Sequence, residues 1–304
     1  MKKLITLLIL ISTNVFAQQD PQYSTYQFNP LVINPAYAGA RDGLSATASV
    51  RNQWVGFDGA PKTIAAGVHS PILNRNIGIG LTLYNDVMGP RNLTGAYGNF
   101  AYILKLNNKY KLSFGLSAGL NRYAFNFNKL TYKQNENTID FSQVQTFNSF
   151  DVNSGLYFRS NSFFIGLSNT HLFASDVFKI ETGNNSFLSY RLRTHNFLSI
   201  GKSFLINENF IFAPTLMLKT VSGKGMADIN LNAFLFKKVW FGLFVRTGYG
   251  PGFLFQYYIN NNFKVGYSFD VGGGHAKYLG GSHEIVINFE MPSKKSKVIS
   301  PRFL

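Results

Sequence analysis

The feature that most constrains this chain is a two-residue alternation of apolar and polar side chains, which recurs from residue 43 to residue 290. It is clearest in residues 111–121, KLSFGLSAGLN, where every second side chain is apolar and those between are small or polar. Because side chains alternate across a β-strand, such a segment has one apolar face and one polar face. The apolar positions here are Leu112, Phe114, Leu116, Ala118 and Leu120. The pattern predicts an all-β protein.

Fourteen segments of this kind follow one another, and each is predicted to be a strand. Tight polar turns and more variable connections separate them alternately, and two connections, 125–148 and 172–188, are long. An even strand number, with short turns at one end and longer loops at the other, is typical of outer-membrane barrels. The predicted strands cover residues 43–55, 61–71, 76–87, 91–106, 110–124, 150–160, 161–171, 189–206, 208–221, 225–237, 239–248, 250–260, 263–274 and 280–290.

These strands predict a transmembrane up-and-down antiparallel β-barrel of about 14 strands over residues 43–290. In lipid every backbone N–H and C=O group needs a partner, and a sheet achieves this only by closing on itself. A soluble β-sandwich is the alternative. Its core would have to be filled from both sheets, and the Gly, Ser and Asn side chains of the polar face supply too little bulk for that.

Residues 1–17 have the features of a secretory signal peptide, with Lys2 and Lys3 before an apolar run and a small-residue cleavage site at Ala17. The apolar run is shorter than the roughly 20 residues that a membrane-spanning helix needs. The chain has no cysteine, so disulfides are excluded. We therefore expect an outer-membrane protein whose two termini both lie in the periplasm.

Composition agrees with a lipid-facing surface, because aromatic residues make up 16% of the chain and charged residues only 14%. The formal net charge of +15 raises the possibility of nucleic-acid binding. We expect no nucleic-acid partner, since the chain carries an export signal and its basic residues do not cluster on a helix. Outer-membrane lipid is the first partner that the sequence implies.

Residues 18–42 precede the first predicted strand and contain the stretch NPLVINPAYAGARD at 29–42. Its two prolines remove backbone donors and push the preceding asparagines towards extended geometry, so neither a regular helix nor a central strand fits. We predict a periplasmic or plug-like segment that packs into the barrel mouth or fixes a partner there. A structured leader that only covers the base of the barrel is the alternative. The candidate residues are Asn29, Pro30, Asn34, Pro35, Tyr37 and Gly39.

The sequence offers no catalytic, metal-binding or cofactor-binding motif. Its five histidines show no metal-ligand spacing, and no nucleophile motif is present. An outer-membrane enzyme would need a serine such as Ser175 or Ser222, and neither has an evident base partner. We therefore expect a protein that is not an enzyme and that holds no cofactor.

Basic residues gather near the short turns, where they either solvate the base of the barrel or form a cationic rim that docks an acidic partner. This set contains Arg75, Lys105, Lys109, Lys111, Arg159, Lys202, Lys237, Lys238 and Lys264. Residues 291–304 continue past the last strand as a basic tail, which is either disordered or a periplasmic docking peptide. Its candidate docking residues are Lys294, Lys295, Lys297, Pro301, Arg302, Phe303 and Leu304.

Three motifs of the chain belong together. The first runs through Asn29-Pro30-Leu31 and Ile33-Asn34-Pro35-Ala36-Tyr37-Ala38-Gly39, and the second is Arg51-Asn52-Gln53-Trp54-Val55-Gly56. The third lies in the tail, which ends Ser300-Pro301-Arg302-Phe303-Leu304. With these motifs the chain resembles the PorP/SprF family of type IX secretion system outer-membrane proteins, and the resemblance covers nearly the whole mature chain. It adds Arg51 and Trp54 to the candidate plug or partner-binding residues.

The resemblance implies a barrel that supports export or surface anchoring of cargo proteins, such as the adhesins of gliding motility. Its partners would be a secreted adhesin-like cargo protein, as for SprF-like members, or periplasmic components of the secretion system, as for PorP-like members. A passive solute channel or hydrophobic-compound transporter is the alternative function.

Overall fold

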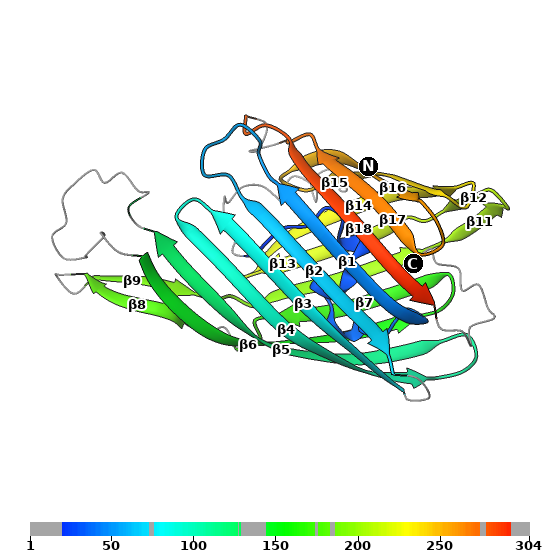
Figure 1. Ribbon diagram of the computed structural model, residues 1–304, viewed down its shortest axis with the longest axis horizontal. Helices are drawn as coiled ribbons and strands as arrows, with labels where there is room; N and C mark the ends of the chain where they lie inside the picture. The colour runs from blue at the N-terminus through cyan, green and yellow to red at the C-terminus, as the bar shows by residue number, and fades with distance from the viewer. Residues whose placement is uncertain are drawn as a thin grey trace, which may run out of the picture.

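The computed structural model describes residues 20–72, 76–126, 128, 144–173, 176–182, 186–273 and 278–292. Most of them belong to one antiparallel sheet that closes into a barrel (Figure 1). The strands in and around the barrel are β1 (Gly43–Asn52), β2 (Lys62–Pro71), β3 (Ile77–Met88), β4 (Arg91–Lys105), β5 (Lys111–Asn126), β6 (Val144–Arg159), β7 (Phe163–Thr170), β10 (His195–Lys202), β11 (Phe204–Asn207), β12 (Phe210–Phe212), β13 (Thr215–Val221), β14 (Lys224–Leu235), β15 (Val239–Arg246), β16 (Gly250–Tyr258), β17 (Phe263–Asp270) and β18 (Ser282–Pro292).

Fourteen strands form the ring, in the order β1 to β7, β10, β13 to β18, and β18 pairs with β1 to close it. The predicted all-β fold and the strand number are thus confirmed. The strand predicted at 189–206 starts too early, since its first residues belong to β9 (Ser186–Arg191) and the ring strand begins at β10. Two ring strands are each interrupted once: β10 continues as β11, and β12 leads into β13. Pro214 lies in the second interruption, where it cannot donate a ladder hydrogen bond. The pairings Gly201 with Thr215 and Phe204 with Phe212 keep the same register across both interruptions.

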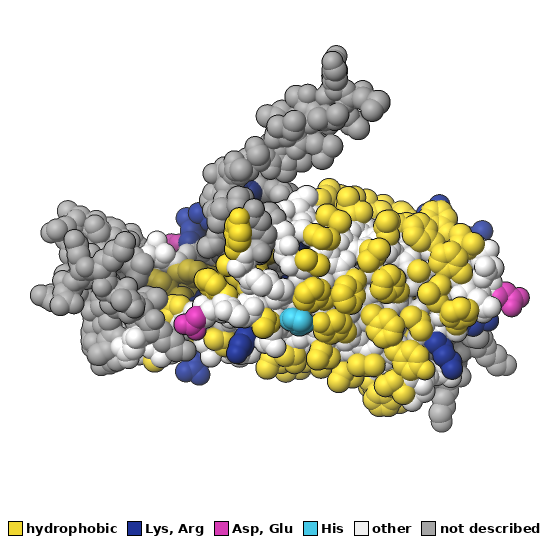
Figure 2. All heavy atoms as spheres, turned by 90° about the horizontal axis from the view of Figure 1, so that it is seen from above, with side chains coloured by type: hydrophobic (Ala, Val, Ile, Leu, Met, Phe, Trp, Pro, Cys, Tyr) yellow, Lys and Arg dark blue, Asp and Glu magenta, His cyan; other side chains and the backbone are white. Residues whose placement is uncertain are grey.

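Apolar side chains line the outer face of the strands, and most of the buried polar side chains lie on the inner face. On β5, Leu116 and Leu120 are 58% and 61% exposed, whereas Ser113 and Asn121 are fully buried. A belt of hydrophobic side chains covers the outer face in Figure 2. This alternation is what a barrel surrounded by lipid requires.

The two ends of the barrel differ. The short-turn end carries the tight turns after β2, β4, β6, β11, β14 and β16, together with the first residue of β1 and the last of β18. The long-loop end carries the connection between β1 and β2 and the segment between β7 and β10. Within that segment β8 (Asp176–Thr182) and β9 (Ser186–Arg191) pair as a separate hairpin.

Both long predicted loops therefore contain more strand than the sequence suggested. Strand β6 begins at Val144 because residues 144–149 pair with the end of β5. The β8–β9 hairpin is held by aromatic packing of Phe178 against Phe125 and Phe147. Among the described residues, no helix is long and apolar enough to cross a bilayer.

Candidate functional site

The barrel interior is occupied by residues 20–42, which we call the lumen segment. It contains three short 3₁₀-helices, η1 (Tyr26–Phe28), η2 (Pro30–Val32) and η3 (Pro35–Tyr37). Pro30 and Pro35 are the first residues of η2 and η3, where a missing N–H group costs nothing. Asn34 is extended, with φ −142° and ψ 107°, and its side chain accepts a hydrogen bond of 2.9 Å from the N–H group of Ala36. The Asn-Pro pair thus caps a tight turn.

The lumen segment runs the length of the barrel. Asp20 contacts His171 and His195, which lie where β7 ends and β10 begins, at the long-loop end. Arg41 is 3.8 Å from Glu290 of β18, close to the short-turn end. The two ends of the described chain, Asp20 and Pro292, therefore lie at opposite ends of the barrel. The prediction that both termini share one side is untested, because the termini themselves lie outside the described residues.

A histidine–aspartate cluster holds the start of the lumen segment. His171 Nε2 is 2.8 Å from Asp20 Oδ1, and His171 Nδ1 is 2.7 Å from Asp151 Oδ2. His195 Nδ1 is 2.6 Å from Asp20 Oδ2. Burial opposes ionisation of Asp20, yet His171 and His195 outweigh it and hold the pKa of Asp20 well below its usual value.

The charge of His171 is stabilised in the same way. Burial disfavours the imidazolium form, but the carboxylates of Asp20 and Asp151 outweigh that effect and raise the pKa of His171 to about 10. At neutral pH the cluster is therefore an ion pair between a histidine that follows a barrel strand and an aspartate of the lumen segment.

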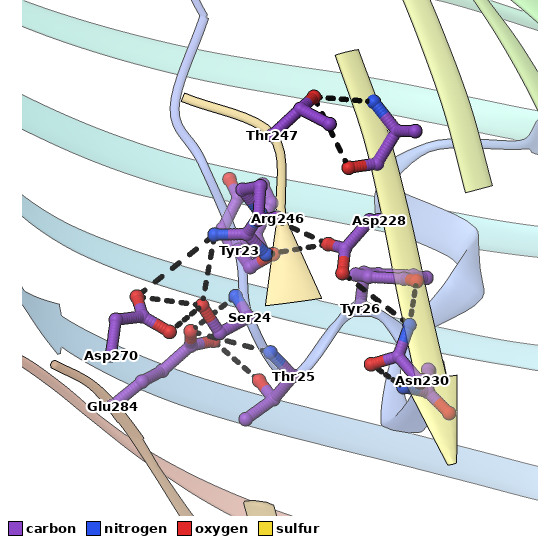
Figure 3. A network of polar contacts seen from close by, with 12 residues as sticks. Tyr23, Ser24, Thr25, Tyr26, Asp228, Asn230, Arg246, Thr247, Asp270 and Glu284 are labelled. Carbon is purple, nitrogen blue, oxygen red and sulfur yellow. Dashed lines mark hydrogen bonds and ion pairs between the residues drawn. The ribbon is translucent and has the colours of Figure 1, made fainter. Parts of the chain in front are cut away.

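A second polar cluster, the arginine network, fixes Ser24 and Thr25 (Figure 3). Glu284 Oε2 accepts a hydrogen bond of 2.7 Å from the Ser24 N–H group, and Thr25 Oγ1 donates to Glu284 Oε1. Ser24 Oγ donates to Asp270 over 2.9 Å. The acceptors come from β17 and β18, which lie more than 240 positions away along the chain.

Two buried arginines complete this network. Arg51 is 1% exposed; it donates to Ser24 Oγ over 2.9 Å and forms ion pairs with Asp270 and Glu284. Arg246 is paired with Asp228 at 2.8 Å and also reaches Ser24 Oγ at 3.3 Å. Removing either cation would leave a carboxylate buried without its partner, which is costly. The network therefore anchors the lumen segment to four strands of the wall, β1, β15, β17 and β18.

Towards the short-turn end the lumen segment touches the wall directly. Asn34 Nδ2 donates to the carbonyl groups of Leu156 and Leu167, at 3.1 and 3.3 Å. A Cβ atom at Gly115 would lie 2.1 Å from the Ala36 nitrogen, and one at Gly78 would lie 2.1 Å from the Ala38 oxygen. Only glycine allows an approach this close.

The other predicted residues of the lumen segment also lie against the wall or line a cavity. Tyr37 is buried and packs edge-on against Tyr157 and His69, and the N–H group of Gly39 donates to His69 Nδ1 over 3.2 Å. Asn29 is also buried against the wall, and Pro30 lines a cavity beside the segment.

Trp54 does not join the lumen segment. It lies in the connection between β1 and β2, where it stacks on Tyr249 with the ring centres 6.5 Å apart. The predicted docking residues of the tail, from Lys294 to Leu304, lie outside the described residues.

Little space remains around the lumen segment. Two cavities beside it measure about 90 and about 70 Å³, well below the roughly 300–1,000 Å³ of small-molecule sites. Within the described ranges, no group of His, Asp and Glu residues is arranged to hold a metal ion.

Sequence reasoning missed most of the wall residues of this site. Arg51 was a candidate, but Asp228, Arg246, Asp270 and Glu284 were not. The available signal was their position: each is a charged residue on the inward-facing side of its strand, near the long-loop end.

Only some of the basic residues predicted to form a cationic rim lie at the surface of the barrel. Lys264 is buried and forms an ion pair of 2.8 Å with Glu290, and Arg159 is half-buried. Alternation along β6 and β17 turns both side chains into the barrel rather than towards the surface. Lys105, Lys109, Lys202, Lys237 and Lys238 are exposed.

The barrel is similar in shape to solved channels of the outer membrane. The CymD monoaromatic hydrocarbon channel has a TM-score of 0.50 and 10% sequence identity, over 86% of this chain and 91% of that chain. A TodX monoaromatic hydrocarbon channel carrying a deletion has a TM-score of 0.50 and 10% identity, over 87% and 94%. At this identity the likeness shows the fold alone. No curated protein matches by sequence.

The sequence itself is more informative, and it confirms the resemblance noted above. The family model of the type IX secretion system membrane protein PorP/SprF matches residues 15–289, which include the lumen segment and nearly the whole barrel. The chain therefore belongs to the PorP/SprF family of type IX secretion system membrane proteins.

Proposed function

We propose that this protein is a plugged, non-enzymatic barrel of the outer membrane that supports export or surface anchoring of cargo proteins by the type IX secretion system. The observation that carries the proposal is the lumen segment, which is tied to the wall at both ends of the barrel. A filled barrel suits a docking platform better than a conduit.

The energetic design of the lumen supports this role. Buried ion pairs are destabilising when one partner is lost, so the arginine network favours a single seated position of the segment. The close approaches at Gly78 and Gly115 require shape complementarity with the seated segment. A rigid, sealed barrel presents its rims and loops as fixed surfaces on which a partner can bind.

In the proposed orientation the short-turn end faces the periplasm, as in other barrels of this layout. Periplasmic components of the secretion system would then meet the short turns, and an adhesin-like cargo would be held at the long-loop end. The C-terminal tail, which continues from β18 at the short-turn end, is a candidate docking peptide on the periplasmic side.

Affinity purification from outer membranes, followed by mass spectrometry of the co-purifying chains, tests the proposal. An unrelated outer-membrane barrel with the same tag is the control. Recovery of a large adhesin indicates the SprF-like role, and recovery of periplasmic secretion components indicates the PorP-like role. Recovery of neither, from a correctly folded barrel, contradicts the proposal.

A passive channel for solutes or hydrophobic compounds is the second candidate. The solved neighbours CymD and TodX are described as monoaromatic hydrocarbon channels, which is a statement about those proteins. Planar-bilayer conductance separates the two functions. We expect the full chain to carry no ionic current. We expect a variant lacking residues 18–42 to carry current and to lose export of the cargo. A conducting full chain with unimpaired export after the deletion would favour the channel.

A further inference from the structure

Three cations lie side by side on neighbouring strands at the short-turn end. Lys105 is the last residue of β4, Lys111 the first of β5 and Arg159 the last of β6. In the sheet, Lys105 is directly opposite Lys111, and Lys111 is directly opposite Arg159. We call these three residues the cationic row. Directly opposed like charges destabilise a sheet, so the row has an unfavourable energy by itself.

All three side chains of the row are on the inner face of the barrel. Two positions further along the same strands are Ile103, Ser113 and Tyr157, which are buried in the interior. Because residues two apart share a face of a strand, the row points into the short-turn mouth and not into lipid.

Within the described part of the chain, no carboxylate forms an ion pair with a member of the row. Asp42 of the lumen segment is within electrostatic range of Lys111 and Arg159, but the opposite charge of Arg41 directly precedes it along the chain and also acts on Arg159. Glu290 is paired with Lys264 at 2.8 Å and lies 3.8 Å from Arg41. Arg159 Nε is buried and has no hydrogen-bond partner. The row therefore retains an uncompensated positive charge.

Water reaches the row from the mouth. Lys105 is exposed, whereas Lys111 and Arg159 are half-buried. The solvent exposure of the side chains therefore decreases from Lys105 to the other two residues of the row. On the outer face at the same level, Tyr110 stacks on Phe158 with ring centres 5.5 Å apart. Aromatic pairs of this kind mark the membrane–water interface of barrels. Lipid headgroups would meet that outer face, on the other side of the wall from the row.

We propose that the cationic row is a binding site for an acidic, extended segment of a partner protein. Neighbouring strands are about 4.8 Å apart, so the row spans about 10 Å. A single small anion contacts part of that length, whereas carboxylates spaced along an extended chain can meet all three cations. The guanidinium of Arg159 can bind a carboxylate through two parallel hydrogen bonds. This assignment goes beyond the export role, because it names a ligand chemistry that can be measured on the purified barrel.

The test uses the full-length barrel in detergent and a fluorescent hexaglutamate peptide, with binding followed by anisotropy. The row variant carries Lys105→Gln, Lys111→Gln and Arg159→Gln. The matched control carries Lys202→Gln, Lys237→Gln and Lys238→Gln, which removes the same charge from the same end of the barrel but from exposed positions outside the row. We expect affinity to fall about tenfold for the row variant and less than about twofold for the control.

Other results overturn the proposal. Equal losses in both variants would mean general electrostatic attraction, and unchanged affinity in the row variant would mean that the peptide binds elsewhere. Displacement of the peptide by inorganic phosphate at the same charge concentration would assign a small-anion site. Displacement by phosphatidylglycerol micelles would assign lipid headgroups instead.

A second variant, with a single substitution, tests the proposal even where the triple row variant does not fold. The chain has no cysteine, so Lys105→Cys provides a single reactive site at the exposed end of the row. We expect a negatively charged thiol reagent to weaken peptide binding and a positively charged one to restore it. Identical binding after both reagents overturns the proposal.

Discussion

His171 Nε2 lies 2.8 Å from Asp20 Oδ1, and this contact joins the start of the lumen segment to the long-loop end of the barrel. His171 directly follows β7, and its second ring nitrogen contacts Asp151 of β6. One imidazole thus connects two wall strands to the segment that fills the lumen. Because the contact depends on a charged histidine, the seating of the segment is coupled to pH.

This coupling predicts a loss of stability in alkaline solution. The pKa of His171 is raised to about 10 in the folded barrel, from an ordinary value of 6.5. A group with a raised pKa contributes stability fully below its unfolded value, and that contribution disappears as pH rises through the folded value. The midpoint of heat-induced unfolding, followed by gel migration, should therefore fall between about pH 6.5 and about pH 10.

The control for this experiment is His171→Gln, which removes the titrating group. We expect the variant to be less stable than the wild type at pH 6.5 and to show a flatter dependence over the same range. Asp20 adds no slope there, because its lowered pKa places its titration in acid solution. Parallel curves for the two proteins would contradict the role assigned to His171.

Arg51→Gln should destabilise the barrel strongly, since it leaves Asp270 and Glu284 buried with one cation fewer. Breaking a buried ion pair by removing one partner costs about 3–5 kcal/mol. The measurement is the free energy of unfolding in urea from lipid vesicles. Arg122→Gln is the matched control, because Arg122 is exposed, and such surface changes stay within about 0.5 kcal/mol. Similar losses in both variants would show that the network is not what stabilises the fold.

Much of the fold could be predicted because a barrel wall repeats one local rule. Alternation of apolar and small polar residues identifies a strand with lipid on one side, and it located all fourteen strands of the ring. The same rule missed the β8–β9 hairpin, most of which lies in the connection predicted at 172–188. It also placed the start of β6 late, because residues 144–149 extend the ladder past the region where apolar side chains face lipid.

The site was less predictable, for a different reason. The turn at Asn34 and Pro35 follows from local chemistry, so its shape could be expected from the sequence. The partners of Ser24 are distant along the chain: Asp270 and Glu284 are brought to it only by closure of the ring. No local pattern specifies such pairs. Charged residues at inward positions were the one available sign, and they do not identify their partners.

Leu116→Arg tests the lipid-facing assignment of the outer wall. Leu116 is 58% exposed and lies near the middle of β5. An arginine at the bilayer midplane of a barrel costs about 2–4 kcal/mol, and one near the interface costs about 0–1 kcal/mol. Leu106→Arg is the matched control, because Leu106 is 51% exposed but lies just beyond the short-turn end of β4. We expect the free energy of unfolding to fall much more for Leu116→Arg, and equal effects would place the membrane elsewhere.

Gly115→Ala should unseat the lumen segment with the smallest possible change in the wall. The added Cβ atom would lie 2.1 Å from the nitrogen of Ala36, a backbone atom that can move only if η3 moves. Gly98→Ala is the matched control on the neighbouring strand, because the nearest atom to its Cβ would be 3.9 Å away. Both changes remove the same backbone freedom from a strand, so any difference between them reports the contact with the lumen segment.

We expect Gly115→Ala to lower the unfolding midpoint and to produce current in planar bilayers, while Gly98→Ala remains silent. Accelerated proteolysis within residues 20–42, detected by mass spectrometry, would show that the same change exposes the segment. If Gly115→Ala stays silent, protease-resistant and as stable as Gly98→Ala, the seat at η3 does not hold the segment in place. The lumen would then have to be sealed by the contacts of Asp20 and Ser24 at the opposite end, and the conductance of Arg51→Gln would become the deciding measurement.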